Sequence, residues 1–107
     1  MDSDVLEVTN DERVQRYETR IDGVLAHIQY SRTGSRITFL HTEVPPALEG
    51  RGVGSALARF ALDDARLRGL EVVPLCPFVS AYIRRHPEYL PLVVREHRAR
   101  LEQADAS

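Results

Sequence analysis

Several residue types are scarce or missing in this chain. It has one cysteine, Cys76, no tryptophan and no lysine, so all 14 of its cationic residues are arginine. A single cysteine excludes an internal disulfide and a cysteine-rich metal site. The net charge of −2 provides no basic field for nucleic acid or for an anionic membrane surface. We therefore expect neither nucleic acid nor a membrane among its partners.

Long apolar runs are also missing, since none approaches the roughly 20 residues of a membrane span. The first stretch, "MDSDVLEVTNDER", is acidic and lacks the apolar core of a signal peptide. No cluster of His, Cys, Asp and Glu has the spacing of metal ligands. We expect a soluble protein in the reducing cytoplasm that binds no metal.

Three extended segments in the first half of the chain predict antiparallel strands at 13–21, 24–32 and 36–44. Asp22-Gly23 between the first two is a strong signal for a two-residue hairpin. In the second segment, apolar residues alternate with polar ones, as in a strand with one buried face. The segments together predict a three-strand meander.

The second half predicts a β-α-β unit followed by helices. Apolar residues recur with helical spacing from Val53, and Gly69 suits the end of that helix. A short strand at 70–75 and a helix at 78–85 follow, and Pro91 can open a third helix. A helical crossover makes strands 36–44 and 70–75 parallel. The fold class is therefore α/β (α+β), with a mixed sheet.

This pattern divides the chain into three parts. Residues 1–12 are expected to form a flexible tail, residues 13–92 one small domain, and residues 93–107 a C-terminal helix with a frayed end. An open sheet edge could pair with a second chain, so we expect a monomer or a weak homodimer.

Three glycines alternate where the first helix should begin, in "EGRGVGSAL" (49–57). A helix N-terminus offers unpaired N–H groups and a partial positive charge, and glycine lets a phosphate approach the backbone. Gly50, Gly52 and Gly54 would bend around a pyrophosphate, to which Arg51 and Ser55 could donate. The alternative is a tight strand-to-helix turn that binds nothing.

With the preceding strand and "EVPP", this loop resembles the acyl-CoA loop of the GNAT superfamily of N-acetyltransferases, Q/R-x-x-G-x-G/A. Glu49 departs from the first position of that pattern. A minimal subgroup of small GNAT-like proteins is more similar still, with "HTEVP" (41–45), "GRGVG" (50–54), Cys76 and "HPEY" (86–89) as the counterparts here. The resemblance covers about residues 13–92.

The resemblance implies a domain that binds acetyl-CoA between two splayed parallel strands. The amides of Gly50 to Ser55 would hold the phosphates, and the backbone near Thr42 to Val44 would bind the pantetheine and the thioester carbonyl. The residues expected around the coenzyme are Thr42, Val44, Glu49, Gly50, Arg51, Gly52, Val53, Gly54 and Ser55.

Topology alone brings Val44, the glycine loop and Cys76 to one sheet edge. In direct transfer, Glu43 or His41 would take the proton of the attacking amine. In a ping-pong route, Cys76 would carry the acetyl group first. The alternatives are that Cys76 is a small buried residue and that His41 is structural, on the same strand face as Ile37 and Phe39.

The sequence thus predicts an acetyl-CoA-dependent N-acetyltransferase, with a primary amine on a small molecule or a protein as acceptor. The competing hypothesis is a CoA-binding or protein-interaction module without turnover.

Overall fold

The fold is built on one five-stranded sheet with strand order β1-β2-β3-β4-β5. The computed structural model describes residues 6–106, so residues 1–5 and 107 of the expected tails lie outside it. The first four strands are antiparallel neighbours, and β5 pairs with β4 in parallel. The strands are β1 Thr9–Asp11, β2 Arg16–Ile21, β3 Val24–Thr33, β4 Arg36–Glu43 and β5 Glu71–Pro74.

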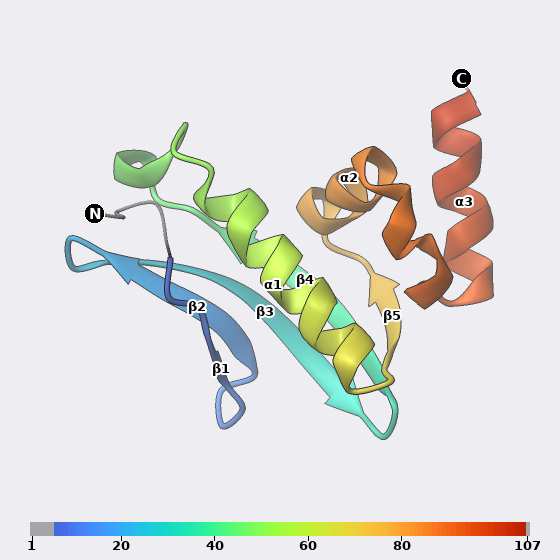
Figure 1. Ribbon diagram of the computed structural model, residues 1–107, viewed down its shortest axis with the longest axis horizontal. Helices are drawn as coiled ribbons and strands as arrows, with labels where there is room; N and C mark the ends of the chain where they lie inside the picture. The colour runs from blue at the N-terminus through green and yellow to red at the C-terminus, as the bar shows by residue number, and fades with distance from the viewer. Residues whose placement is uncertain (1–5, 107) are drawn as a thin grey trace.

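The helices follow the sheet in the order that the sequence predicts. α1 crosses one face of the sheet, while α2 and α3 lie beyond the end and edge of β5 (Figure 1). This arrangement confirms the predicted α/β class with a mixed sheet. The helices are α1 Val53–Leu67, α2 Pro77–Arg85 and α3 Arg95–Ala106, with short 3₁₀ helices η1 Pro46–Leu48 and η2 Pro87–Leu92.

The expected tail 1–12 is wrong in one respect, because Thr9–Asp11 forms the edge strand β1 and pairs with residues 16–18 of β2. Leu6 and Val8 pack against the core as well. A strand of three residues is too short to show an alternating pattern in the sequence. The domain boundaries themselves stay predictions.

The third helix begins at Arg95, not at Pro91, which lies inside η2. The reason is a contact with the sheet. Val93 forms a parallel bridge with Val72, and the Val94 N–H donates to the Val72 carbonyl over 3.0 Å. The chain is extended at that bridge and therefore cannot be helical there.

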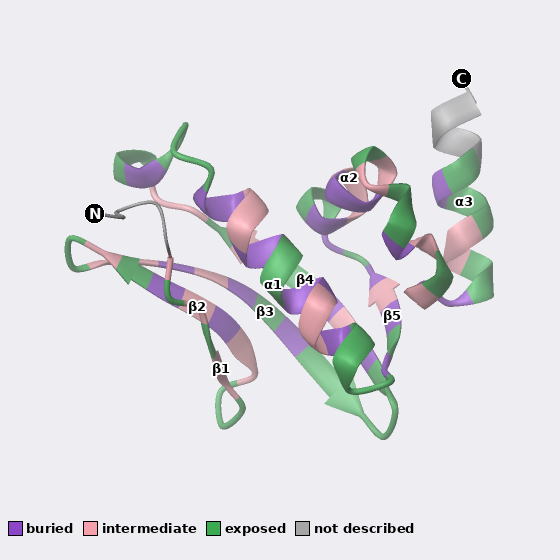
Figure 2. Cartoon of the chain, in the orientation of Figure 1, coloured by how far each residue is buried: buried purple, intermediate pink, exposed green. Residues whose placement is uncertain are grey.

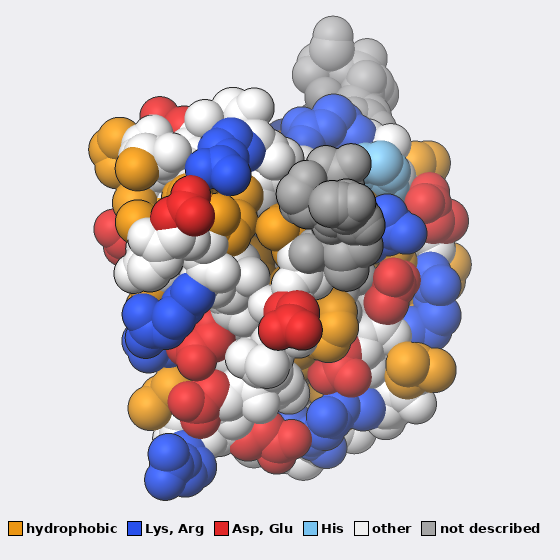
Figure 3. Space-filling view, turned by 60° about the vertical axis from the view of Figure 1, so that its left-hand side comes forward, with side chains coloured by type: hydrophobic (Ala, Val, Ile, Leu, Met, Phe, Trp, Pro, Cys, Tyr) orange, Lys and Arg blue, Asp and Glu red, His pale blue; other side chains and the backbone are white. Residues whose placement is uncertain are grey.

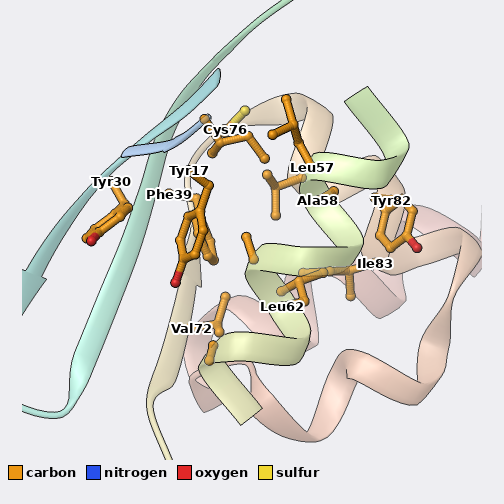
Figure 4. Close-up of a cluster of buried hydrophobic side chains, with 14 of the residues drawn as sticks. Tyr17, Tyr30, Phe39, Leu57, Ala58, Leu62, Val72, Cys76, Tyr82 and Ile83 are labelled. Carbon is orange, nitrogen blue, oxygen red and sulfur yellow. The ribbon is translucent and has the colours of Figure 1, made fainter. Parts of the chain in front are cut away.

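One hydrophobic core lies between the helices and the sheet, where Figure 2 shows the buried residues. Along α1 the buried positions recur every three or four residues, which is the spacing of one helix face. They meet Tyr17 and Phe39 from the strands (Figure 4). Each fully buried large side chain contributes about 1.5–3 kcal/mol to folding.

A β-bulge interrupts β4 at Leu40. Gln29 pairs with His41 and Tyr30 pairs with Phe39, so Leu40 has no partner on β3. Because strand side chains alternate, one extra residue moves every later side chain to the other face. We call the face that packs on α1 the inner face and the opposite one the outer face. Thr42, paired with buried Ile28, therefore lies on the inner face.

Candidate functional site

The two parallel strands part at one edge of the sheet. Their pairing ends at Phe39 and Pro74, and the Cys76 N–H donates to the Phe39 carbonyl over 2.9 Å. β4 continues to Glu43 while β5 stops, and the chain then enters η1 and the glycine loop before α1 (Figure 1). The crossover thus gathers the end of β4, the loop and the α1 N-terminus, as the sequence predicts.

A pocket of about 360 Å³ opens at this junction. The predicted coenzyme residues surround it, with the exception of Arg51. Leu48 and Phe78 complete the wall, and no sequence motif predicted either residue. The lining residues are Thr42, Val44, Leu48, Glu49, Gly50, Gly52, Val53, Gly54, Ser55 and Phe78.

Two of the loop glycines have positive φ, 81° at Gly50 and 75° at Gly52. Only glycine adopts this left-handed conformation at little cost. A Cβ atom at either position would meet nothing within 4 Å, so the side of the loop that lacks side chains is open. Gly52 is also the N-cap of α1, and no side chain caps this helix end. The first N–H groups of α1 are therefore available to an anion.

Gly54 is glycine for a different reason. A Cβ atom there would lie 2.6 Å from Cζ of Phe78, so the Phe78 ring packs directly on the backbone of the first turn of α1. This contact joins α1 to α2 across the pocket. No local sequence signal marks Phe78, because its role depends on a glycine 24 positions earlier in the chain.

Arg51 lies outside this pocket and lines a neighbouring cavity of about 770 Å³. Arg59 and Phe60 of α1 line that cavity too, and Gly52 and Val53 line both spaces. The Nη1 atom of Arg51 is 3.9 Å from an Asp22 carboxylate oxygen, an exposed ion pair that constrains the guanidinium little. The two cavities therefore meet at the glycine loop, and the larger one is lined by two arginines and by the carboxylate of Asp63.

Cys76 is 2% exposed and belongs to the core at the end of β5 (Figure 4). Its Sγ atom is 3.1 Å from Oγ1 of Thr42, and it is the N-cap residue of α2. Thr42 lines the pocket, whereas Cys76 does not. The thiol thus lies behind Thr42, which forms part of the pocket wall, and does not itself line the pocket.

His41 and Glu43 do not share a face with Ile37 and Phe39, and that prediction is wrong. The bulge at Leu40 turns both side chains to the outer face, where His41 Nε2 is 3.3 Å from Glu43 Oε1. Both side chains are exposed, at 63% and 59%. The pair therefore lies on the opposite side of the sheet from the pocket.

His27 belongs to the same outer-face group. It pairs with Glu43 in the β3–β4 register, and its ring centroid is 6.5 Å from that of His41. Burial lowers the pKa of His27, and the charge of Arg16 lowers it further. Its Nδ1 atom is buried without a hydrogen-bond partner among the described residues. The neutral imidazole is thus favoured in the folded protein.

The aromatic residues near "HPEY" pack instead of lining the pocket. Tyr82 is buried and stacks on His86 at a centroid distance of 4.2 Å. The Tyr89 hydroxyl donates to Asp63 over 2.7 Å, and burial with this hydrogen bond raises the pKa of Tyr89 to about 12. These groups stabilise the contact between α1 and η2.

The surface carries no strong field over the face in Figure 3, where acidic and basic side chains of the described residues are interspersed. Within residues 6–106, no three His, Cys, Asp or Glu side chains are placed to hold a metal ion. None of the helices there is long and apolar enough to cross a membrane.

Comparison with known proteins identifies the family. The family model for the GCN5-related N-acetyl-transferase matches residues 16–92. Protein NATD1 of Homo sapiens is 34% identical over 85 residues, which cover 77% of this chain and 75% of the relative. Protein NATD1 of Gallus gallus is 33% identical over 85 residues, with coverage of 77% and 77%. Protein NATD1 of Danio rerio is 29% identical over 94 residues, with coverage of 83% and 86%. These matches confirm the resemblance carried by the glycine loop, and the chain belongs to the family of GCN5-related N-acetyltransferases.

Proposed function

We propose that this protein transfers the acetyl group of acetyl-CoA to an amine. The observation that carries the proposal is the pocket where β4 leaves β5, because the uncapped N-terminus of α1 and two left-handed glycines meet there. A pyrophosphate needs unpaired N–H groups and a backbone without side chains in the way. The loop supplies both.

The residues present suit a long anionic substrate. The N–H groups at the start of α1 would bind the pyrophosphate, and the helix dipole would add to that attraction. Beyond Phe39, β4 has no described strand on its β5 side, so the backbone at 42–44 is free to hydrogen-bond the pantetheine amides. Glu49 is the one unfavourable group, since its carboxylate also lines the pocket.

The adjoining larger cavity suits the nucleotide end of the same molecule. Arg51 and Arg59 would neutralise a further phosphate, and Phe60, which is 40% exposed, offers an aromatic surface to a purine. Because Gly52 and Val53 line both spaces, one ligand could occupy them together.

We propose direct transfer. The amine nitrogen attacks the thioester carbonyl carbon, the C–S bond breaks, and CoA leaves as the thiolate. Because the pairing of β4 and β5 ends at Phe39 and Pro74, the acetyl end of the coenzyme would pass between the two strands to the outer face. There the His41–Glu43 pair would take the proton that the amine loses. Cys76 is buried and does not line the pocket, so no acetyl-cysteine is required.

One observation favours the competing function, a CoA-binding module without turnover. Among the described residues that line the pocket, Glu49 is the only ionisable one. Binding would then occur without an acid or base beside the thioester. The location in the reducing cytoplasm stays a prediction. The oligomeric state, a monomer or a weak homodimer, stays a prediction as well.

Thermal unfolding with CoA tests binding, and mass spectrometry of amine mixtures with acetyl-CoA tests turnover. CoA at a hundredfold excess over Kd should add about 2.7 kcal/mol. For a domain near 100 residues this raises Tm by roughly 10–20 °C. A Tm that does not change at millimolar CoA would overturn both functions. A raised Tm without any acetylated amine would favour the binding module.

A further inference from the structure

A second groove lies behind the connection from β5 to α2. It has a volume of about 310 Å³ and is bounded by that connection, α2 and α3. Its apolar lining comes from Pro74, Leu75, Pro77 and Leu101. Leu75 is 54% exposed, so its side chain is accessible to a ligand in the groove. The groove therefore offers apolar contact to a small ligand.

The polar groups of this groove are mostly basic. Arg84 of α2 lies with His97 and Arg100 of α3, and no acidic side chain is among the lining residues. The Nδ1 atom of His97 is buried and has no hydrogen-bond partner within the described part of the chain. Arginine binds carboxylates through paired N–H donors. The groove is thus suited to an apolar molecule that carries a carboxylate.

Only one segment of chain separates the groove from the proposed coenzyme pocket. Pro74, Leu75 and Pro77 line the groove, whereas Phe78 lines the pocket. Between them, the Cys76 thiol points to Thr42 of the pocket wall. A ligand in the groove therefore lies close to the point where β4 and β5 part.

Side chains of opposite charge lie on the two sides of the point where β4 and β5 part. Leu40 and Leu75 follow the last paired residues of β4 and β5, and both side chains are exposed. On the β4 side lies the carboxylate of Glu43, and on the other side lie Arg84 and Arg100. An ammonium group is attracted to the first side and a carboxylate to the second.

We propose that the acceptor is an amino acid with an apolar side chain, whose carboxylate binds in the groove between α2 and α3. This inference rests on the proposed acetyl transfer. The amine would lie over Leu40 and Leu75, toward His41 and Glu43. The apolar side chain would contact the prolines and leucines of the groove.

The test compares L-leucine with isopentylamine, which has the same carbon skeleton without the carboxylate. With acetyl-CoA, leucine should be acetylated with a kcat/KM about 10- to 100-fold higher, the effect of charged hydrogen bonds. Arg84→Gln and Arg100→Gln should raise KM for leucine by a similar factor and leave the reaction of isopentylamine unchanged. Arg85→Gln is the matched control, because Arg85 is exposed on the same helix and does not line the groove.

A binding measurement separates this inference from the proposed function. Amide chemical shifts are recorded with leucine, in the presence and absence of saturating CoA. Shifts at Leu75, Arg84 and His97 that Arg84→Gln abolishes would support the groove, even in a protein that acetylates nothing. Equal acetylation of the two amines overturns the inference, and so does the absence of leucine-induced shifts at the groove. Failure of CoA to raise Tm bears on the proposed function alone.

Discussion

Thr42 Oγ1 lies 3.1 Å from Cys76 Sγ and joins the ends of the two parallel strands. The two residues are 34 positions apart in the chain. Thr42 faces the proposed coenzyme pocket, while Cys76 lies behind it in the core. This contact therefore sets the position of the pocket wall. It also places the thiol next to the pocket without exposing it.

We expect Cys76→Ala to keep the acetyl transfer within a few-fold of the wild-type rate. Removing one buried atom of this size should cost about 1 kcal/mol of unfolding free energy. That corresponds to a Tm lower by roughly 4–8 °C. Enzyme kinetics and thermal unfolding of the same preparation measure the two effects.

The ping-pong route gives the opposite result for the same residue. Incubation with acetyl-CoA and no acceptor would then leave a hydroxylamine-sensitive acetyl group on the wild-type protein. Cys76→Ala would remove both this adduct and turnover while CoA binding stayed intact. Detection of such an adduct by intact mass would rule out direct transfer as the only route.

We expect Glu43→Gln to lower kcat by about 100-fold or more, the usual contribution of a general base. His41→Gln should have a smaller effect, since the imidazole acts through its 3.3 Å contact with Glu43. CoA binding should not change in either variant, because both side chains lie on the outer face. The control is Glu71→Gln, an exposed carboxylate at the opposite end of the parallel strands. A Glu43→Gln variant that keeps its activity would show that another group takes the proton from the amine.

The position of the pocket follows from signals that are local in the sequence. Helical spacing after Val53 and the strand at 70–75 predict a crossover, and a crossover has one handedness. The end of β4, the glycine loop and Cys76 are therefore expected at the same end of the sheet. The glycines also indicate the backbone conformation of the loop, since glycine adopts a left-handed φ angle at little cost.

The faces of β4 could not be predicted in this way. Nothing in "ITFLHTE" shows that the faces are exchanged at Leu40, because the three residues after it are all polar and show no alternation. The bulge depends on pairing with β3, which is a tertiary contact, and it moved His41 and Glu43 to the outer face. The groove between α2 and α3 is equally non-local, since Pro74 and Arg100 line it together.

We expect Gly52→Val to destabilise the protein by about 1–2 kcal/mol, because the φ of 75° is left-handed and valine is branched at Cβ. Gly52→Asn should be tolerated better, since asparagine visits this conformation. Both variants should bind CoA at least tenfold more weakly, about 1.4 kcal/mol. Urea unfolding and calorimetric titration separate the two effects. Full CoA affinity in the folded Asn variant would place the phosphates elsewhere.

We expect the stability of the protein to fall between pH 7 and pH 5 in part through His27. The pKa of His27 in the folded state is lowered below its ordinary value of 6.5, chiefly by burial and then by Arg16. In this window the unfolded chain binds a proton that the folded protein resists, so stability decreases as the pH falls through 6.5. The decrease ends once the pH is below the folded pKa. Glu43 opposes the shift, since its charge favours the protonated ring.

His27→Gln should therefore flatten the dependence of unfolding free energy on pH, measured in urea at pH 7, 6 and 5. An equally steep dependence in His27→Gln and wild type would show that other groups carry the acid sensitivity.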